Sequence, residues 1–152
     1  MDGARLMLKD NLKKAKFELN EKEEEVIFLL LKHKYGLYAA EIARVMKFND
    51  SKVRALLYCL RSKGLLESKE VESIISQSVA LGQKLIVPDG YRVMSNKNLE
   101  IPCKKGCVTR ISDANVVVDE DGFRIPFQRR SGTHRAVMYK IKTELFEILS
   151  QT

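Results

Sequence analysis

The sequence predicts an α+β protein, with helices in the first 66 residues, a β-rich segment near residues 99–127, and a closing helix. Two observations lead to this fold class. Apolar residues recur at helical spacing in the N-terminal part and again after residue 132. Between these parts, runs of β-branched residues alternate with turn motifs, which is typical of short strands. A chain of 152 residues is long enough to bury a core without disulfides.

Two helices are expected first. One helical face of residues 4–20 carries four apolar residues, namely Leu8, Leu12, Ala15 and Leu19. Asn20 can cap a second helix, whose first turn is rich in glutamates that suit the positive end of a helix dipole. The body of this helix, residues 26–31, is apolar all round and is therefore expected to be largely buried. Gly36 is expected to end this second helix.

Two further helices follow. The third is expected over about residues 39–47. The fourth runs from residue 51 to about residue 63, with Asp50 or Ser51 as its N-cap. Gly64 stops the fourth helix, and an extended segment begins after it.

The second half of the chain has the signals of short strands. Residues 71–81 fit either a helix or a strand, whereas residues 84–94 show a strand-turn-strand pattern around a Pro-Asp-Gly turn. A hairpin is expected over residues 116–127, and a last helix over about residues 134–150. These elements suggest four segments: an N-terminal helix (1–20), a helical domain with the strand-turn-strand pattern (21–94), a β-rich segment with a basic loop (95–131) and a C-terminal helix (132–152).

The third and fourth helices have the properties of a helix-turn-helix. Small residues, which a close helix crossing requires, stand at Ala39, Ala40 and Ala43. At 100° per residue, one side of the fourth helix is apolar and carries Val53, Leu56, Leu57 and Leu60. The opposite side carries Ser51, Ala55, Tyr58 and Ser62, flanked by Arg54 and Arg61 on one edge and Lys52 on the other. Such a face could approach a DNA groove closely and present cations to the phosphates.

Residues 21–66 resemble the winged helix-turn-helix of the MarR, ArsR and PadR types of prokaryotic transcriptional regulators. The matching features are the pair Ile42-Ala43, the helix that begins at Ser51, and the ending Lys63-Gly64-Leu65. The resemblance implies DNA binding through the fourth helix, and a dimer formed by the terminal helices. In those regulators a wing hairpin follows the Gly-Leu directly, whereas here about 17 residues separate Leu66 from the pattern at 84–94. Either the wing is long, with residues 65–71 as its first strand, or an extra helix intervenes.

The charge of the chain also favours a polyanionic partner. The net charge is +7, from 27 basic and 20 acidic residues. Acidic residues are absent between Gly122 and Thr143, a stretch that includes Arg129 and Arg130 in an expected loop. This stretch either contacts phosphates or forms an ordinary solvated face.

We therefore expect sequence-selective binding of double-stranded DNA in transcription regulation, by a homodimer with helix 51–63 in the major groove. The candidate DNA-binding residues are Ser51, Lys52, Arg54, Ala55, Tyr58, Arg61, Lys84, Arg92, Arg129 and Arg130. The alternative is a winged helix that binds proteins, as a subunit of a transcription or replication complex. A DNA affinity that falls steeply with salt concentration would distinguish a DNA-binding protein from a protein-interaction module.

Catalysis, cofactors and metals are not expected. The sequence contains none of the common hydrolase, P-loop or dinucleotide motifs. Its three cysteines (Cys59, Cys103 and Cys107) fit neither a disulfide framework nor the usual zinc spacing. The longest apolar run, residues 26–31, is too short to cross a bilayer, and a cytoplasmic location is expected.

Overall fold

A computed structural model describes residues 3–72, 75–76, 84–86, 90–95, 100–101, 108–110, 115–125, 127–128 and 135–151. The chain has an α+β fold, as the sequence predicts. It divides into two compact units. The helical unit comprises Met1–Ser68 and Met138–Thr152, and the inserted unit comprises Lys69–Val137. These boundaries differ from the four segments suggested by sequence, because the last segment, from Met138 onward, belongs to the same unit as the first.

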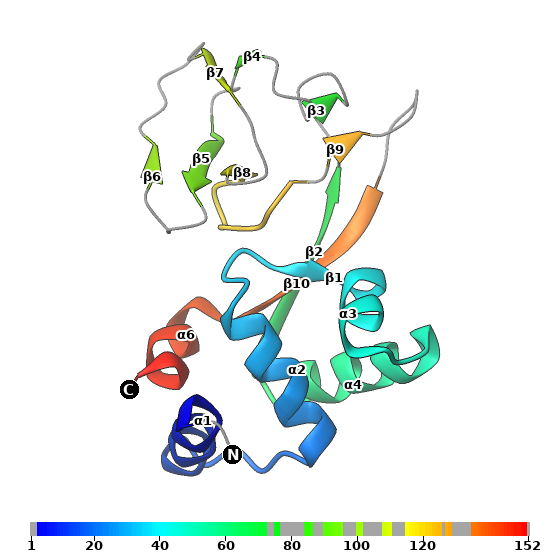
Figure 1. Cartoon of the computed structure of the whole chain (residues 1–152), viewed down its shortest axis with the longest axis vertical. Helices are drawn as coiled ribbons and strands as arrows, with labels where there is room; N and C mark the ends of the chain where they lie inside the picture. Colours follow the sequence, from blue (N-terminus) through cyan, green and yellow to red (C-terminus); the bar gives the residue numbers. More distant parts are fainter. Residues whose placement is uncertain are drawn as a thin grey trace. The chain divides into compact units, whose positions relative to one another are not determined.

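The helical unit contains all the helices of the described residues (Figure 1). They are α1 (Gly3–Lys14), α2 (Glu21–Leu31), α3 (Ala39–Met46), α4 (Asp50–Ser62) and α6 (Thr143–Ser150). Helix α2 lies in the middle of the unit and contacts α1, α4 and α6. In the described part of the chain, no helix has the length and apolar composition needed to cross a membrane.

The first two helices show how local sequence sets their ends. The Asn20 side chain accepts a hydrogen bond from the Glu23 N–H at 2.8 Å, and the Glu23 carboxylate accepts one from the Asn20 N–H at 3.0 Å. This capping box confirms Asn20 as the cap of α2. The expected helix over residues 4–20 is too long, because α1 ends at Lys14. Lys16 adopts a left-handed conformation (φ 65°), which turns the chain away from the helix axis.

A three-stranded sheet connects the two chain segments that form the helical unit. Its strands are β1 (Leu37–Tyr38), β10 (Arg135–Ile141) and β2 (Leu66–Glu72), in the order β1-β10-β2. Strands β1 and β10 are antiparallel, with Leu37 opposite Tyr139. The expected helix over residues 134–150 is therefore wrong over Arg135–Ile141, where the chain forms a strand. Its β-branched and aromatic residues suit a strand, and pairing with β1 and β2 satisfies its backbone.

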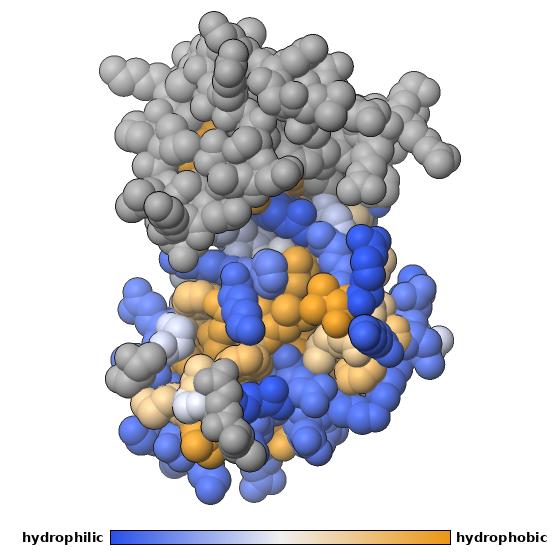
Figure 2. All heavy atoms as spheres, in the orientation of Figure 1, coloured by the Kyte–Doolittle hydropathy of each residue, from blue (hydrophilic) through white to orange (hydrophobic). Residues whose placement is uncertain are grey.

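The core of the helical unit absorbs the apolar faces of both terminal helices. Leu8 and Leu12 of α1 and Leu149 of α6 are buried in the same cluster as the residues of α2, α3 and α4. The buried amide of Asn11 donates to the backbone oxygens of Leu149 (3.2 Å) and Gln151 (2.8 Å), which ties α1 to the chain's end. On the face shown in Figure 2, hydrophobic residues gather around the C-terminal end of α2, and hydrophilic residues surround them.

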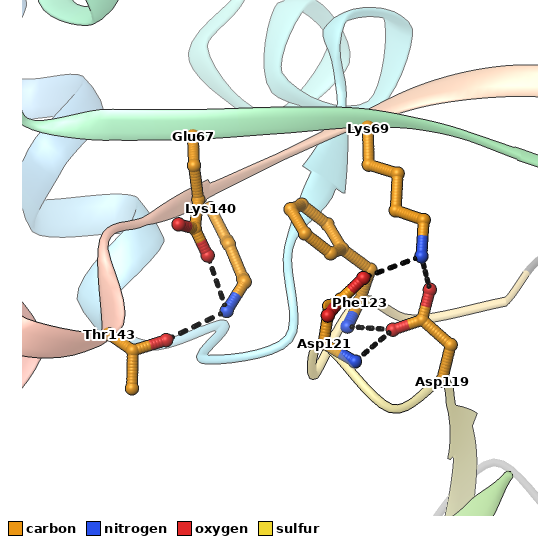
Figure 3. A network of polar contacts seen from close by, with 7 residues as sticks. All are labelled: Glu67, Lys69, Asp119, Asp121, Phe123, Lys140 and Thr143. Atoms are coloured by element: carbon orange, nitrogen blue, oxygen red, sulfur yellow. Dashed lines mark hydrogen bonds and ion pairs between the residues drawn. The ribbon is translucent and has the colours of Figure 1, made fainter. Parts of the chain in front are cut away.

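A buried ion pair links β10, β2 and α6 within the helical unit. The Lys140 side chain is 5% exposed, and its Nζ lies 2.8 Å from the Glu67 carboxylate and 3.1 Å from the Thr143 hydroxyl (Figure 3). The Glu67 side chain keeps 34% of its surface exposed. The ammonium of Lys140 is thus held by partners on both neighbouring elements.

The inserted unit is built from short strands. The strand pairs are β3 (Ile75–Ser76) with β9 (Phe127–Gln128), β4 (Lys84–Ile86) with β7 (Val108–Arg110), and β5 (Arg92–Ser95) with both β6 (Glu100–Ile101) and β8 (Asn115–Val118). The β-rich segment near 99–127 is confirmed. The strand-turn-strand pattern at 84–94 does form strands, but in the described residues β4 pairs with β7, and β5 pairs with β6 and β8, rather than with each other. Within residues 71–81, the described parts are strand rather than helix.

Asp119 organises the turn that follows β8. Its Oδ1 accepts hydrogen bonds from the backbone N–H groups of Asp121 (3.0 Å) and Phe123 (2.9 Å), a local arrangement that suits aspartate in turns. Val118 forms an isolated antiparallel bridge with Arg124, so the expected turn at 119–122 is confirmed, whereas the expected second strand over residues 123–127 is not, because Phe127 pairs with Ile75 of β3. The Lys69 ammonium lies 2.8 Å from the carboxylates of both Asp119 and Asp121, and these two contacts raise its pKa (Figure 3).

Candidate nucleic-acid interface

Helix α4 begins at Asp50 and ends at Ser62, one residue earlier at each end than the sequence predicts. Its N-cap is Asn49, whose Oδ1 accepts the Lys52 N–H at 2.8 Å, so the expected caps Asp50 and Ser51 are wrong. Asn49 caps the helix because its side-chain oxygen lies opposite the backbone N–H of the residue three positions later. Gly64, with φ +84°, ends the helix as expected.

Two opposite faces of α4 have contrasting surroundings. Val53, Leu57 and Leu60 are each at most 1% exposed, and the half-buried Leu56 packs against the same core. The other side of the helix is open to solvent and carries Ser51, Arg54, Ala55, Tyr58, Arg61 and Ser62. Tyr58 is 71% exposed. The division into a packing face and a free face is the one predicted by helical periodicity.

The cations on the free face of α4 are not used to hold the fold. Within the described residues, Arg54 and Arg61 form no ion pair or side-chain hydrogen bond. Lys63, next along the chain, behaves differently, because its ammonium contacts the Glu23 carboxylate at 2.9 Å and the Glu18 carbonyl oxygen at 3.0 Å. As far as the described residues go, the two guanidinium groups are therefore available to an external acceptor.

Three side chains meet at the N-terminal end of α4. The ammonium of Lys52 lies 4.2 Å from the centroid of the Phe48 ring, and the ammonium of Lys22, on α2, lies 5.6 Å from the same centroid. The pKa of Lys52 is lowered, chiefly by the contact with Lys22 and then by partial desolvation, whereas the negative charge of Glu25 acts in the opposite direction. Phe48 itself is half-buried and packs against the core, so both ammonium groups lie near a ring that core packing holds in place.

The remaining candidate residues belong to the inserted unit or lie outside the described residues. Lys84 begins β4 and Arg92 begins β5, and both belong to the inserted unit. Arg92 is half-buried and pairs with Val118 in the sheet. Arg129 and Arg130 lie outside the described residues.

Sequence reasoning missed Lys22 and Phe48. The spacing of Phe48 and Lys52, four residues apart across the start of a helix, is a local signal that could have suggested their contact. Lys22 gives no such signal, because it reaches Phe48 only through the packing of α2 against α4.

Metal ligands, cysteines and a cavity are the other candidate features of the described residues. In these residues, no group of three or more His, Cys, Asp or Glu side chains could hold a metal ion. Cys59 is exposed on α4, and Cys103 and Cys107 lie outside the described residues. The inserted unit has an open cavity of about 430 Å³ whose charged lining is mostly acidic: Lys69, Glu70, Glu72, Asp119, Glu120 and Asp121. Such a lining would repel nucleic acid.

The free face of α4 therefore combines groups that suit nucleic acid: guanidinium forks for base edges or phosphates, and small residues that permit close approach. Comparison of the chain with protein-family models, curated proteins and solved structures finds no match. The function is therefore inferred from the residues of α4 and their immediate neighbours.

Proposed function

We propose that this chain is a winged helix-turn-helix protein that binds double-stranded DNA sequence-selectively through α4, and that it acts as a cytoplasmic transcriptional regulator without catalytic activity. The observation that carries the proposal is the free face of α4. It is solvent-exposed over the length of a 13-residue helix, and its two arginines have no acidic partner among the described residues. An α-helix of this length spans about 20 Å and fits the major groove, which is about 12 Å wide.

The order of elements in the helical unit supports the proposal. In the regulators that residues 21–66 resemble, a wing hairpin follows the Gly-Leu after the recognition helix. Here β2 begins at Leu66, directly after Gly64-Leu65, and its neighbour in the sheet is β10. Strands β2 and β10 thus correspond to the two strands of a wing, and the inserted unit takes the position of the wing's turn in the chain. Of the two alternatives for the chain after Leu66, this correspondence favours a long wing that begins with residues 65–71 over an extra helix.

Individual residues of α4 have distinct proposed roles. Arg54 has the planar fork that can donate two hydrogen bonds to a guanine edge, and it stands near the N-terminal end that reads bases in helix-turn-helix proteins. Ser51 and Ala55 are small and permit close approach. Arg61 and Tyr58 lie further along the helix, where backbone contacts are expected. Lys84 and Arg92 drop out of the proposal, since their strands do not form the wing hairpin.

A second candidate function is protein interaction. Tyr58 (71% exposed) on α4 and Val45 (58% exposed) on α3 are large apolar groups on the surface of the helix-turn-helix. Aromatic residues are enriched at protein interfaces, so the exposed Tyr58 supports this second candidate.

A homodimer remains part of the proposal, because readers of this kind commonly bind two half-sites. The apolar faces of α1 and α6, which the resemblance assigns to the dimer interface, pack instead within their own chain. Leu6 (48% exposed) and Ile148 (42% exposed) are the large apolar residues that these two helices still present to solvent.

The direct test is titration of the full chain with a fluorescent duplex of random sequence over a range of salt concentrations. Each phosphate that the chain neutralises should contribute about −0.9 to the slope of log affinity against log salt concentration, so a DNA-binding chain should show a clearly negative slope. A protein-interaction module would show no measurable duplex binding even at low salt, and that result would contradict the proposal.

A further inference from the structure

Lys22 and Lys52 form a pair of neighbouring cations that the helical unit does not neutralise. Lys22 stands in the first turn of α2 and Lys52 in the first turn of α4, and the two ammonium groups share the Phe48 ring at 5.6 and 4.2 Å from its centroid. Within the described residues, neither lysine has a carboxylate within 4.0 Å. By contrast, the ammonium of Lys63 lies 2.9 Å from the Glu23 carboxylate, and that of Lys69 lies 2.8 Å from the Asp119 carboxylate.

Bringing two ammonium groups together is unfavourable in the free protein. The lowered pKa of Lys52 is the consequence, since each positive charge disfavours the other. Glu25 offsets this repulsion only in part, and the carboxylate of Asp50 stands exposed in the first turn of α4. Interaction with the Phe48 ring compensates a cation modestly, by about 0.5–1 kcal/mol at exposed sites. An anion placed between the lysines would remove the repulsion.

The first turn of α4 adds hydrogen-bond donors beside the lysines. The first N–H groups of any α-helix have no partner within the helix. In α4 the Asn49 side chain satisfies the Lys52 N–H and the Asn49 carbonyl satisfies the Val53 N–H, which leaves the N–H groups of Asp50 and Ser51. Donors of this kind, with the positive end of the helix dipole, suit a phosphate group.

We propose that Lys22, Lys52 and the first turn of α4 hold one backbone phosphate of duplex DNA, next to the bases that Arg54 contacts. This inference rests on the proposed DNA binding and deepens it, because it assigns a role to α2, outside the helix-turn-helix itself. The phosphate would anchor the N-terminal end of α4 and so fix the register in which α4 lies along the groove. Both lysines serve the same phosphate, so their contributions are coupled rather than additive.

The test compares salt dependences of duplex binding for Lys22→Gln, Lys52→Gln, the double variant and Lys13→Gln. Lys13 is an exposed lysine in the last turn of α1 and controls for the loss of one positive charge. The quantity compared is the slope of log affinity against log salt concentration. Because a single phosphate is involved, the double variant should flatten this slope by about 0.9, and each single variant by less than that. Lys13→Gln should leave the slope unchanged.

Two outcomes would overturn the inference while leaving the proposed DNA binding intact. A double variant that binds duplex with the slope of Lys13→Gln would show that neither lysine contacts a phosphate. A slope change of about 1.8 in the double variant would indicate two separate phosphates. Failure of the unmodified chain to bind duplex at any salt would instead contradict the proposed function.

A second measurement needs no DNA. NMR titration of the lysine side chains should find the pKa of Lys52 below its ordinary value, and Lys22→Gln should raise it toward 10.5 by removing the neighbouring cation. An unchanged Lys52 pKa in Lys22→Gln would mean that the two ammonium groups are not neighbours, and the phosphate site would then be rejected.

Discussion

Gly36 is the residue at which a single added methyl group should most directly disturb the pairing of β1 with β10. Its φ is +102°, a conformation that residues with a side chain rarely adopt. A Cβ atom at this position would lie 2.7 Å from Cγ of Met138 and 2.9 Å from the backbone oxygen of Tyr139. Met138 is fully buried, and Tyr139 is fixed opposite Leu37 in the sheet, so neither atom can move freely.

The expected cost of Gly36→Ala has two parts. The unfavourable backbone conformation contributes about 1–3 kcal/mol. Overpacking against Met138 and the Tyr139 oxygen adds about 1–3 kcal/mol. The free energy of unfolding should therefore fall by about 2–6 kcal/mol.

Gly64→Ala is the matched control. Gly64 also has a positive φ (+84°), but an added Cβ would meet only the Lys142 ammonium, at 4.0 Å. This variant should lose only the conformational part, about 1–3 kcal/mol. Urea unfolding of both variants measures the difference. Equal losses of stability in the two variants would refute the close approach of β10 to Gly36, on which the order β1-β10-β2 depends.

Three further predictions concern the buried ion pair, oligomeric state and the basic loop. Glu67→Ala should destabilise the protein by about 1–3 kcal/mol, because the buried Lys140 ammonium loses the Glu67 carboxylate, whereas Lys140→Met should cost less; chemical denaturation checks the order, and the reverse order would refute it. Light scattering at micromolar concentration should give the mass of a dimer, and a monomer mass would remove dimerisation from the proposal. Replacing Arg129 and Arg130 together by Ala should flatten the salt slope of DNA binding by up to about 1.8 units per subunit; an unchanged slope would identify this stretch as a solvated surface.

Features that depend on neighbouring residues were predictable from the sequence. The Asn20 cap follows from an Asn three residues before a Glu, and the two faces of α4 follow from the spacing of Val53, Leu57 and Leu60. The exposed position of Arg54 follows from the same spacing. These patterns act within one or two helical turns, so they need no knowledge of the rest of the fold.

Features that depend on distant residues were not predictable. Residues 135–141 have apolar spacing compatible with a helix, but β1, about 100 residues earlier, supplies backbone partners that make them a strand. The pattern at 84–94 predicts two strands correctly, yet their partners are chosen by longer-range packing. Lys22 reaches Phe48 through helix packing for the same reason.

The most direct test of DNA reading by α4 is a paired titration of Arg54→Ala against a cognate and a random duplex, the cognate site being selected beforehand from a random pool. Arg54 lies on the free face and makes no packing contact with the core, so the variant should fold normally. Loss of a bidentate contact with guanine predicts a cost of about 1–3 kcal/mol on the cognate site and a relaxed sequence preference. Unchanged affinity for both duplexes in a folded Arg54→Ala variant would contradict the reading role of α4.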